Sequence, residues 1–108
     1  MTRKSPKRLK GKWRIVEMEL WGKDHLDLVG PAHIALDGKG HGELGFGALV
    51  ATLDCAFVPG GVEFSWQGFE EGDEVFGEGW VELEDDGSLT GEFSYHDGDE
   101  SGFLAQPW

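Results

Sequence analysis

Hydrophobic and polar residues alternate along most of this chain with a period of two, which is the pattern of strands with one buried face. Between positions 62 and 67, for example, Val62, Phe64 and Trp66 alternate with polar residues. Similar runs cover residues 32–36, 44–48, 49–57, 75–84, 89–96 and 103–105. The alternation therefore predicts a chain built mainly of β-strands.

Turn signals separate these runs. Sequences rich in Gly and Asp occur near positions 60, 72, 86 and 97, at the spacing of roughly 8–12 residues expected in a β-sandwich or barrel. Three Asp-Gly pairs are strong hairpin signals, because Gly supplies a positive φ without steric cost. They are Asp37-Gly38, Asp86-Gly87 and Asp97-Gly98. Sequential hairpins give an antiparallel meander, and an eight-stranded meander can close and remove its edge strands.

We therefore predict an all-β fold, a small antiparallel up-and-down barrel of about eight strands with one short helical turn. The helical turn falls within residues 24–31, where Asp24 is the expected N-cap and Gly30-Pro31 is a stop signal. It is expected to cover one end of the barrel. A single domain spans residues 9–108, which suits the length of 108 residues.

The first run, residues 12–21, contains a change of parity. Trp13 and Ile15 share one face, whereas Val16, Met18 and Leu20 share another. The switch between positions 15 and 16 predicts a β-bulge or a local twist. An amphipathic helix is the alternative, and the β-rich remainder of the chain favours the strand.

Glycine and aromatic residues indicate how the barrel is packed. Glycines inside the predicted strands fit sharp bending and close backbone approach in a tight barrel; they are Gly42, Gly45, Gly47, Gly77, Gly79 and Gly91. An eight-stranded barrel is either filled by side chains or holds one small ligand, and the many rings favour the filled form. The aromatic residues expected in the core are Trp13, Phe46, Phe57, Phe64, Trp66, Phe93 and Phe103.

Charge divides into two blocks. The net charge is −12, but seven of the nine Lys and Arg lie in the first 14 residues, and the chain from residue 15 onward carries −19. Such asymmetry indicates a basic tail on an acidic body. Residues 1–8 are predicted to be a disordered basic arm. The arm could contact nucleic acid, but the acidic body would repel phosphates, and a solvated arm that settles loosely on its own acidic surface is favoured.

Several protein classes are disfavoured by composition. No apolar run approaches the roughly 20 residues of a membrane span, and the start of the chain lacks the apolar stretch of a signal peptide. The single cysteine cannot form an internal disulfide. We therefore expect a cytoplasmic protein that does not contact membranes.

The first strand opens with Gly11-Lys12-Trp13, and a Gly-x-Trp followed by an all-hairpin meander resembles the calycins, the lipocalin and avidin superfamily. The segment from Asp86 to Phe93 is similar to the turns and strands of avidin-like barrels. The resemblance implies a barrel that binds a small apolar ligand. This chain is shorter than lipocalins, and no biotin-site residues carry over. It also resembles small bacterial proteins of unassigned function, which implies a bacterial origin.

Candidate catalytic and metal-binding groups are sparse. The string Gly40-His41-Gly42-Glu43-Leu44-Gly45 matches the dinucleotide fingerprint, but no helix is expected after it. His33 and His41 could meet across a hairpin, yet two histidines make a weak zinc site. Acidic turns near positions 86 and 98 lack the ligand spacing of a calcium loop, and Cys55 falls on a core face. We predict no catalytic residue, no metal, no cofactor and no enzyme activity.

Aromatic residues give the two leading hypotheses on function. Trp21, Trp80 and Trp108 fall off the core parity, with Glu82, Glu84 and Asp24 around them, and could form an interaction surface; Trp21 and Trp108 could instead cap the barrel ends. The leading hypothesis is a non-enzymatic acidic β-barrel interaction module that docks a protein partner or its own copy, with basic partners favoured. The alternative is a calycin-like binder of a small apolar ligand, lined by Trp66, Phe64, Phe93 and Tyr95. A nucleic-acid mimic ranks third.

Overall fold

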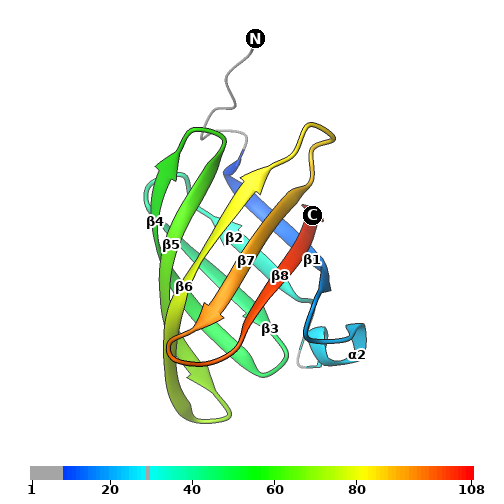
Figure 1. The fold of residues 1–108 in the computed structure, drawn as a ribbon, viewed down its shortest axis with the longest axis vertical. Helices are drawn as coiled ribbons and strands as arrows, with labels where there is room; N and C mark the ends of the chain where they lie inside the picture. Colours follow the sequence, from blue (N-terminus) through cyan, green and yellow to red (C-terminus); the bar gives the residue numbers. More distant parts are fainter. Residues whose placement is uncertain (1–8, 29) are drawn as a thin grey trace.

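A computed structural model describes residues 9–28 and 30–108 and shows eight antiparallel strands closed into a barrel (Figure 1). Each strand pairs with the next along the chain, and the last returns to the first. The strands are β1 (Gly11–Met18), β2 (His33–Leu36), β3 (His41–Phe46), β4 (Leu49–Val58), β5 (Gly61–Glu70), β6 (Asp73–Leu83), β7 (Leu89–Tyr95) and β8 (Glu100–Pro107). The predicted up-and-down barrel is confirmed, whereas the predicted arm, residues 1–8, lies outside the described residues.

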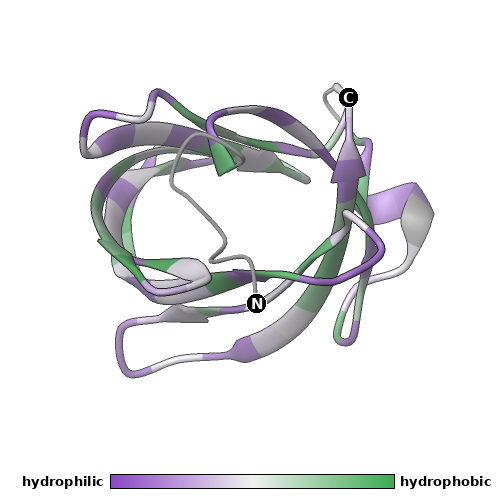
Figure 2. Cartoon of the chain, turned by 90° about the horizontal axis from the view of Figure 1, so that it is seen from above, coloured by the Kyte–Doolittle hydropathy of each residue, from purple (hydrophilic) through white to green (hydrophobic). Residues whose placement is uncertain are grey.

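Side chains fill the ring of strands that is seen from above in Figure 2. Six of the seven aromatic residues expected in the core are at most 6% exposed. The seventh, Phe57, is half-buried and packs against the core from near the end of β4. The alternation of buried and exposed residues along β4 and β5 follows the predicted parity.

Large rings on one strand lie opposite glycines on the next. The cross-strand pairs are Phe64–Gly79, Trp66–Gly77 and Phe103–Gly91. Gly79 also pairs with Phe93 on its other side, so a single glycine lies between two inward rings. A Cβ atom on Gly79 would lie 2.5 Å from Phe64 Cζ, and one on Gly77 would lie 2.9 Å from Trp66 Nε1. Both separations are shorter than any normal carbon contact, so the rings occupy the space of the missing side chains.

A β-bulge in β1 accounts for the change of parity in the first run. Ile15 pairs with Ala105 on β8, and the next pair in register joins Glu17 to Leu104. Val16 is therefore the extra residue, as the sequence predicts. The bulge lets Met18 return to the core, where it is 6% exposed.

The helical turn is α2 (Lys23–Leu26). The prediction of Asp24 as its N-cap is wrong, because the carbonyl of Gly22 accepts the first helical hydrogen bonds and Asp24 lies within the first turn. Leu26 is 1% exposed, and its carbonyl accepts the N–H of Gly47 at 2.8 Å. This bond attaches α2 to the connection between β3 and β4, so the turn covers that end of the barrel as expected.

The two ends of the barrel are closed differently. At the upper end of Figure 1, β1 begins and β6 ends. There Leu9 is 1% exposed, and its carbonyl accepts a hydrogen bond from Trp13 Nε1 at 3.1 Å. At the lower end, the ring of Trp21 packs against Phe46 with centroids 5.1 Å apart. Both ends of the barrel are therefore covered by side chains.

The predicted hairpin turns all form, but one uses a different residue for its positive φ. Gly38 and Gly87 have φ of 80° and 91°, as expected for the second residue of Asp-Gly. In the third turn Asp97 itself has φ 54°. Asp tolerates this left-handed region better than most residues with a side chain.

We expect Gly79→Ala to destabilise the barrel by about 2 kcal/mol, the typical cost of forcing extra carbon into a packed core. Urea denaturation followed by Trp fluorescence measures the change. Gly30→Ala is the matched control, because a Cβ at Gly30 meets nothing within 4 Å. Equal stability of the two variants would contradict the packing of Phe64 over Gly79.

Candidate functional site

The four aromatic residues of the ligand-binding hypothesis come together inside the barrel. The rings of Trp66 and Phe93 stack with centroids 4.7 Å apart, and Tyr95 meets both edge-on at 5.3 and 5.2 Å. Phe64, Trp66 and Phe93 are at most 5% exposed. The rings of Trp66, Phe93 and Tyr95 are thus in contact with one another, and a ligand in a pocket lined by them would have to separate them.

The three tryptophans of the interaction hypothesis lie in three different places. Trp21 is half-buried beside α2, where it stacks on His25 and lines a hollow of about 650 Å³ between β1 and α2. Trp108 is 58% exposed and lies under the ammonium group of Lys12, 4.0 Å from the ring centroid. Trp80 is 40% exposed on the outer face of β6. They do not form one patch, and only Trp80 has acidic residues on both neighbouring strands.

The outer face of β6 alternates carboxylates with aromatic rings. Its outward residues are Glu74, Phe76, Glu78, Trp80 and Glu82. The inward residues of the same strand are the glycines and valines that pack against the core, so the outward parity is fixed. Phe76 is 52% exposed. Two exposed rings four residues apart on one strand are separated by about 13 Å.

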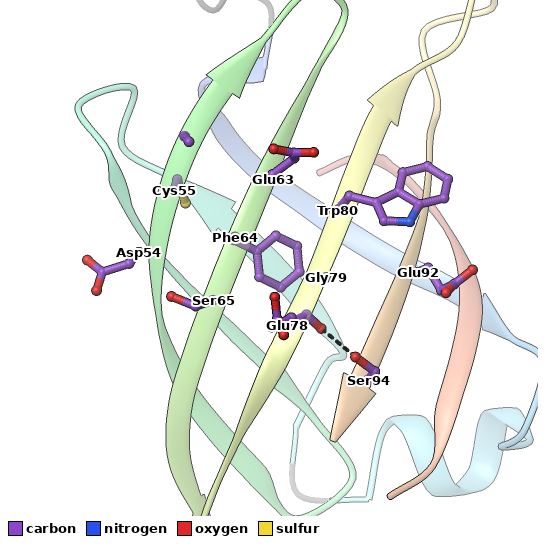
Figure 3. Close-up of a pocket in the computed structure, with 11 residues that line it drawn as sticks. Asp54, Cys55, Glu63, Phe64, Ser65, Glu78, Gly79, Trp80, Glu92 and Ser94 are labelled. Carbon is purple, nitrogen blue, oxygen red and sulfur yellow. Dashed lines mark hydrogen bonds between the residues drawn. The ribbon is translucent and has the colours of Figure 1, made fainter. Parts of the chain in front are cut away.

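Neighbouring strands complete the surface around Trp80. Glu63 on β5 and Glu92 on β7 are its cross-strand partners, so the indole lies between two carboxylates (Figure 3). One row further down, Glu78 lies between Ser65 and Ser94, and Ser94 Oγ donates a hydrogen bond to the Glu78 carbonyl at 3.2 Å. The small side chains of the two serines leave a hollow of about 690 Å³ over these strands.

The hollow continues toward Phe76. The ring of His96 stacks on Phe76 with centroids 4.7 Å apart, and both line an adjoining hollow of about 440 Å³. Asp54, Ser65 and Glu78 line both hollows. We call the continuous surface the acidic groove; it is lined by Asp54, Glu63, Ser65, Phe76, Glu78, Trp80, Glu92, Ser94 and His96.

No Lys or Arg among the described residues lines the acidic groove. All nine Lys and Arg occur at or before position 39, whereas 16 of the 21 Asp and Glu follow it. Among the described residues, no Lys or Arg lies within ion-pair distance of Glu63, Glu78 or Glu92, and the nearest basic group to Asp54 is His41, at 3.9 Å. Exposed carboxylates on adjacent strands repel one another, so this face has a negative electrostatic potential.

The described histidines of the β2–β3 hairpin and the cysteine lie in separate surroundings. Within the described part of the chain, no group of three His, Cys, Asp or Glu side chains is placed to hold a metal ion. His33 and His41 flank the β2–β3 hairpin but contact separate carboxylates, Glu43 and Asp54. Cys55 is half-buried beside the acidic groove, and burial together with Asp37 and Asp54 raises the pKa of its thiol to about 11.

Sequence reasoning found Trp80 but missed Phe76, Glu63 and Glu92. Phe76 lies four residues before Trp80 in the same alternating run, so the two side chains share one face of the strand, and the sequence pattern was enough to predict that Phe76 is exposed. Glu63 and Glu92 could not be predicted in this way, because they are 17 and 12 positions away in the chain, and only the strand register makes them neighbours.

The single tyrosine provides a spectroscopic test of the lower end of the barrel. Burial, the charge of Glu70 and the hydrogen bond that Tyr95 Oη donates to Glu70 at 3.1 Å raise the pKa of this phenol. The neutral form is thus favoured in the folded protein, so this stabilisation is complete below pH 10.0, the ordinary pKa, and is lost as the pH rises above it.

We expect the folded protein to show little tyrosinate absorbance at pH 10.0, and this absorbance should appear only at higher pH. Glu70→Gln should lower the pKa of Tyr95 partway, because burial is the larger cause and remains. A midpoint at the ordinary value in the folded wild-type chain would show that Tyr95 is not held as described.

We expect Cys55 to react slowly with iodoacetamide near neutral pH. A pKa raised from 9.0 to about 11 lowers the thiolate fraction about 100-fold. The more basic thiolate is also the better nucleophile, so the net rate should fall about tenfold relative to the unfolded chain. Mass spectrometry of timed aliquots, with and without concentrated urea, measures this ratio. Equal rates would contradict the raised pKa.

Within the described residues, no helix combines the length and apolar composition needed to span a membrane. No protein-family model, curated protein or solved structure matches this chain.

Proposed function

We propose that this protein is a non-enzymatic binding module whose acidic groove docks an extended basic segment of a protein partner. The observation that carries the proposal is the outer face of β6, where carboxylates alternate with exposed rings and no Lys or Arg of the described residues compensates the charge. The corresponding ligand has cationic side chains that alternate along an extended backbone.

The two kinds of groove residue would act on the same ligand side chains. Carboxylates attract Lys and Arg over distance and speed the encounter. Aromatic faces then hold the cation at close range, most strongly for Trp. The chain already contains one such contact, in which Lys12 lies over Trp108 at 4.0 Å. Trp80, between Glu63 and Glu92, is the strongest candidate for the equivalent contact with a partner.

Backbone pairing with a partner strand is disfavoured by the closed barrel. Each strand pairs with both of its neighbours in the ring, so the barrel has no edge strand of the kind that extends a sheet by strand addition. A partner on the outer wall must therefore contact side chains. Selectivity would come from the spacing of Trp80, Glu78 and Phe76 along β6.

The test is the binding of a fluorescein-labelled peptide in which Lys and Ser alternate, followed by fluorescence anisotropy. We expect saturable binding to the full chain. The triple variant Glu63→Gln, Glu78→Gln and Glu92→Gln should weaken it about tenfold, since each exposed ion pair contributes about 0.5 kcal/mol. Trp80→Thr should weaken it roughly fourfold through the lost cation–π contact.

Matched controls separate the groove from general charge attraction. The triple variant Glu17→Gln, Asp24→Asn and Asp99→Asn makes the same change of net charge at exposed positions outside the acidic groove. Trp108→Thr removes an exposed tryptophan elsewhere on the surface. If these controls weaken the peptide as much as the groove variants do, the binding is non-specific and the proposed function is wrong.

A further inference from the structure

The basic residues near the amino terminus match the acidic groove in charge and in spacing. Arg3 and Lys7 are four positions apart, as are Lys4 and Arg8. Residues four apart in an extended segment lie on one face, about 13 Å from each other. Phe76 and Trp80 have the same separation along β6, with Glu78 between them. Pro6 is compatible with such a segment, because the residue before a proline favours an extended backbone.

We propose that the acidic groove binds the basic amino-terminal segment, residues 3–8, of a second copy of this chain, so that two copies form a dimer by reciprocal exchange of these segments. The inference rests on the proposed function and names the partner. Arg3 and Lys7 of one copy lie over the two aromatic ends of the groove in the other copy. Lys4 and Arg8 lie on the opposite face of the extended segment. A two-fold axis makes the two contacts equivalent.

The reach of the chain disfavours binding within one copy. Leu9 is fixed in the core at the upper end of the barrel, where β6 also ends. Arg3 is six residues from Leu9 and can extend at most about 21 Å from it. Phe76 is seven strand positions below Leu83, which is about 23 Å along the outer wall. The segment must also cross the barrel rim, so its own Arg3 reaches Phe76 only with both the backbone and the Arg3 side chain almost fully extended, whereas the segment of a second copy can approach the groove from outside.

The rest of the chain supports contact between copies through this segment. The described residues of each copy are strongly acidic outside β1 and its flanks, so two barrels repel one another when they approach through other faces. Residues 3–8 carry four of the nine basic side chains. Their transfer to the acidic groove of a partner places cations against Glu63, Glu78 and Glu92, which have no Lys or Arg partner among the described residues.

The direction in which salt changes the stability of the dimer tests the proposal. Both copies have a net charge of −12. Added salt would therefore strengthen a dimer held by apolar contact, because salt screens the repulsion between the barrels. A dimer held by the basic segment in the acidic groove is weakened instead. Sedimentation velocity of the full chain at about 50 mM and about 500 mM NaCl distinguishes the two cases.

The expected result is a dimer at low salt that dissociates at high salt. Replacement of all four cations in the full chain (Arg3→Ser, Lys4→Ser, Lys7→Ser and Arg8→Ser) should give a monomer. The groove variant Glu63→Gln, Glu78→Gln and Glu92→Gln should also be monomeric, whereas the control Glu17→Gln, Asp24→Asn and Asp99→Asn should remain dimeric. A mixture of the two monomeric variants should form a heterodimer at least tenfold weaker than wild type, because one intact contact remains.

Three outcomes would overturn the inference. The full chain could be monomeric at low salt, the variant without the four cations could remain dimeric, or the mixture could fail to associate. Binding of the Lys–Ser peptide tests the proposed function separately. If the cation-free variant binds that peptide through the acidic groove while the full chain is monomeric, the groove function stands and only its assignment to a second copy is wrong.

Discussion

The pairing of inward rings with glycines across β5, β6 and β7 determines how the barrel is filled and which side chains face outward. The interior of an eight-stranded barrel is just wide enough for side chains. Phe64 and Phe93 are both cross-strand partners of Gly79, and the Phe64 ring fits only because this position has no Cβ. A shift of one residue in the register of β6 would place Glu78 and Trp80 in the core. The same packing that fills the barrel therefore fixes which residues form the acidic groove.

Because the packing of the interior holds the barrel together, the outer wall can carry an unfavourable charge distribution. Stability comes from the filled interior, where 22 hydrophobic side chains are buried. The outer residues of β5, β6 and β7 contribute little packing and are free to be acidic. Their mutual repulsion costs some stability, and a cationic ligand would relieve it. Such a trade of stability for binding is common at functional surfaces.

Most of the fold follows from short-range signals in the sequence. Alternation set the inward face of each strand, the Asp-Gly pairs marked hairpins, and the parity switch located the bulge at Val16. The errors arose where local rules compete: Gly22 rather than Asp24 caps α2, and Asp97 rather than Gly98 takes the positive φ. The acidic groove was only partly predictable. The exposure of Trp80 follows from parity, but its neighbours Glu63 and Glu92 depend on the register of three strands, which hairpin lengths alone did not supply.

The closure of the barrel limits where a partner can bind. No strand lies at the edge of the sheet, the rings of Trp66, Phe93 and Tyr95 are in mutual contact, and Leu9 and Trp21 cover the two ends. The outer wall remains, and its character differs around the barrel: β1 carries Lys12 and Arg14, whereas the strands from β3 onward carry no Lys or Arg. One molecule thus presents a basic side and an acidic side of matching chemistry. Head-to-tail contact between the basic side of one copy and the acidic side of the next could continue indefinitely. The proposed exchange of basic segments between two acidic grooves instead closes after two copies. This difference favours a discrete dimer over a filament.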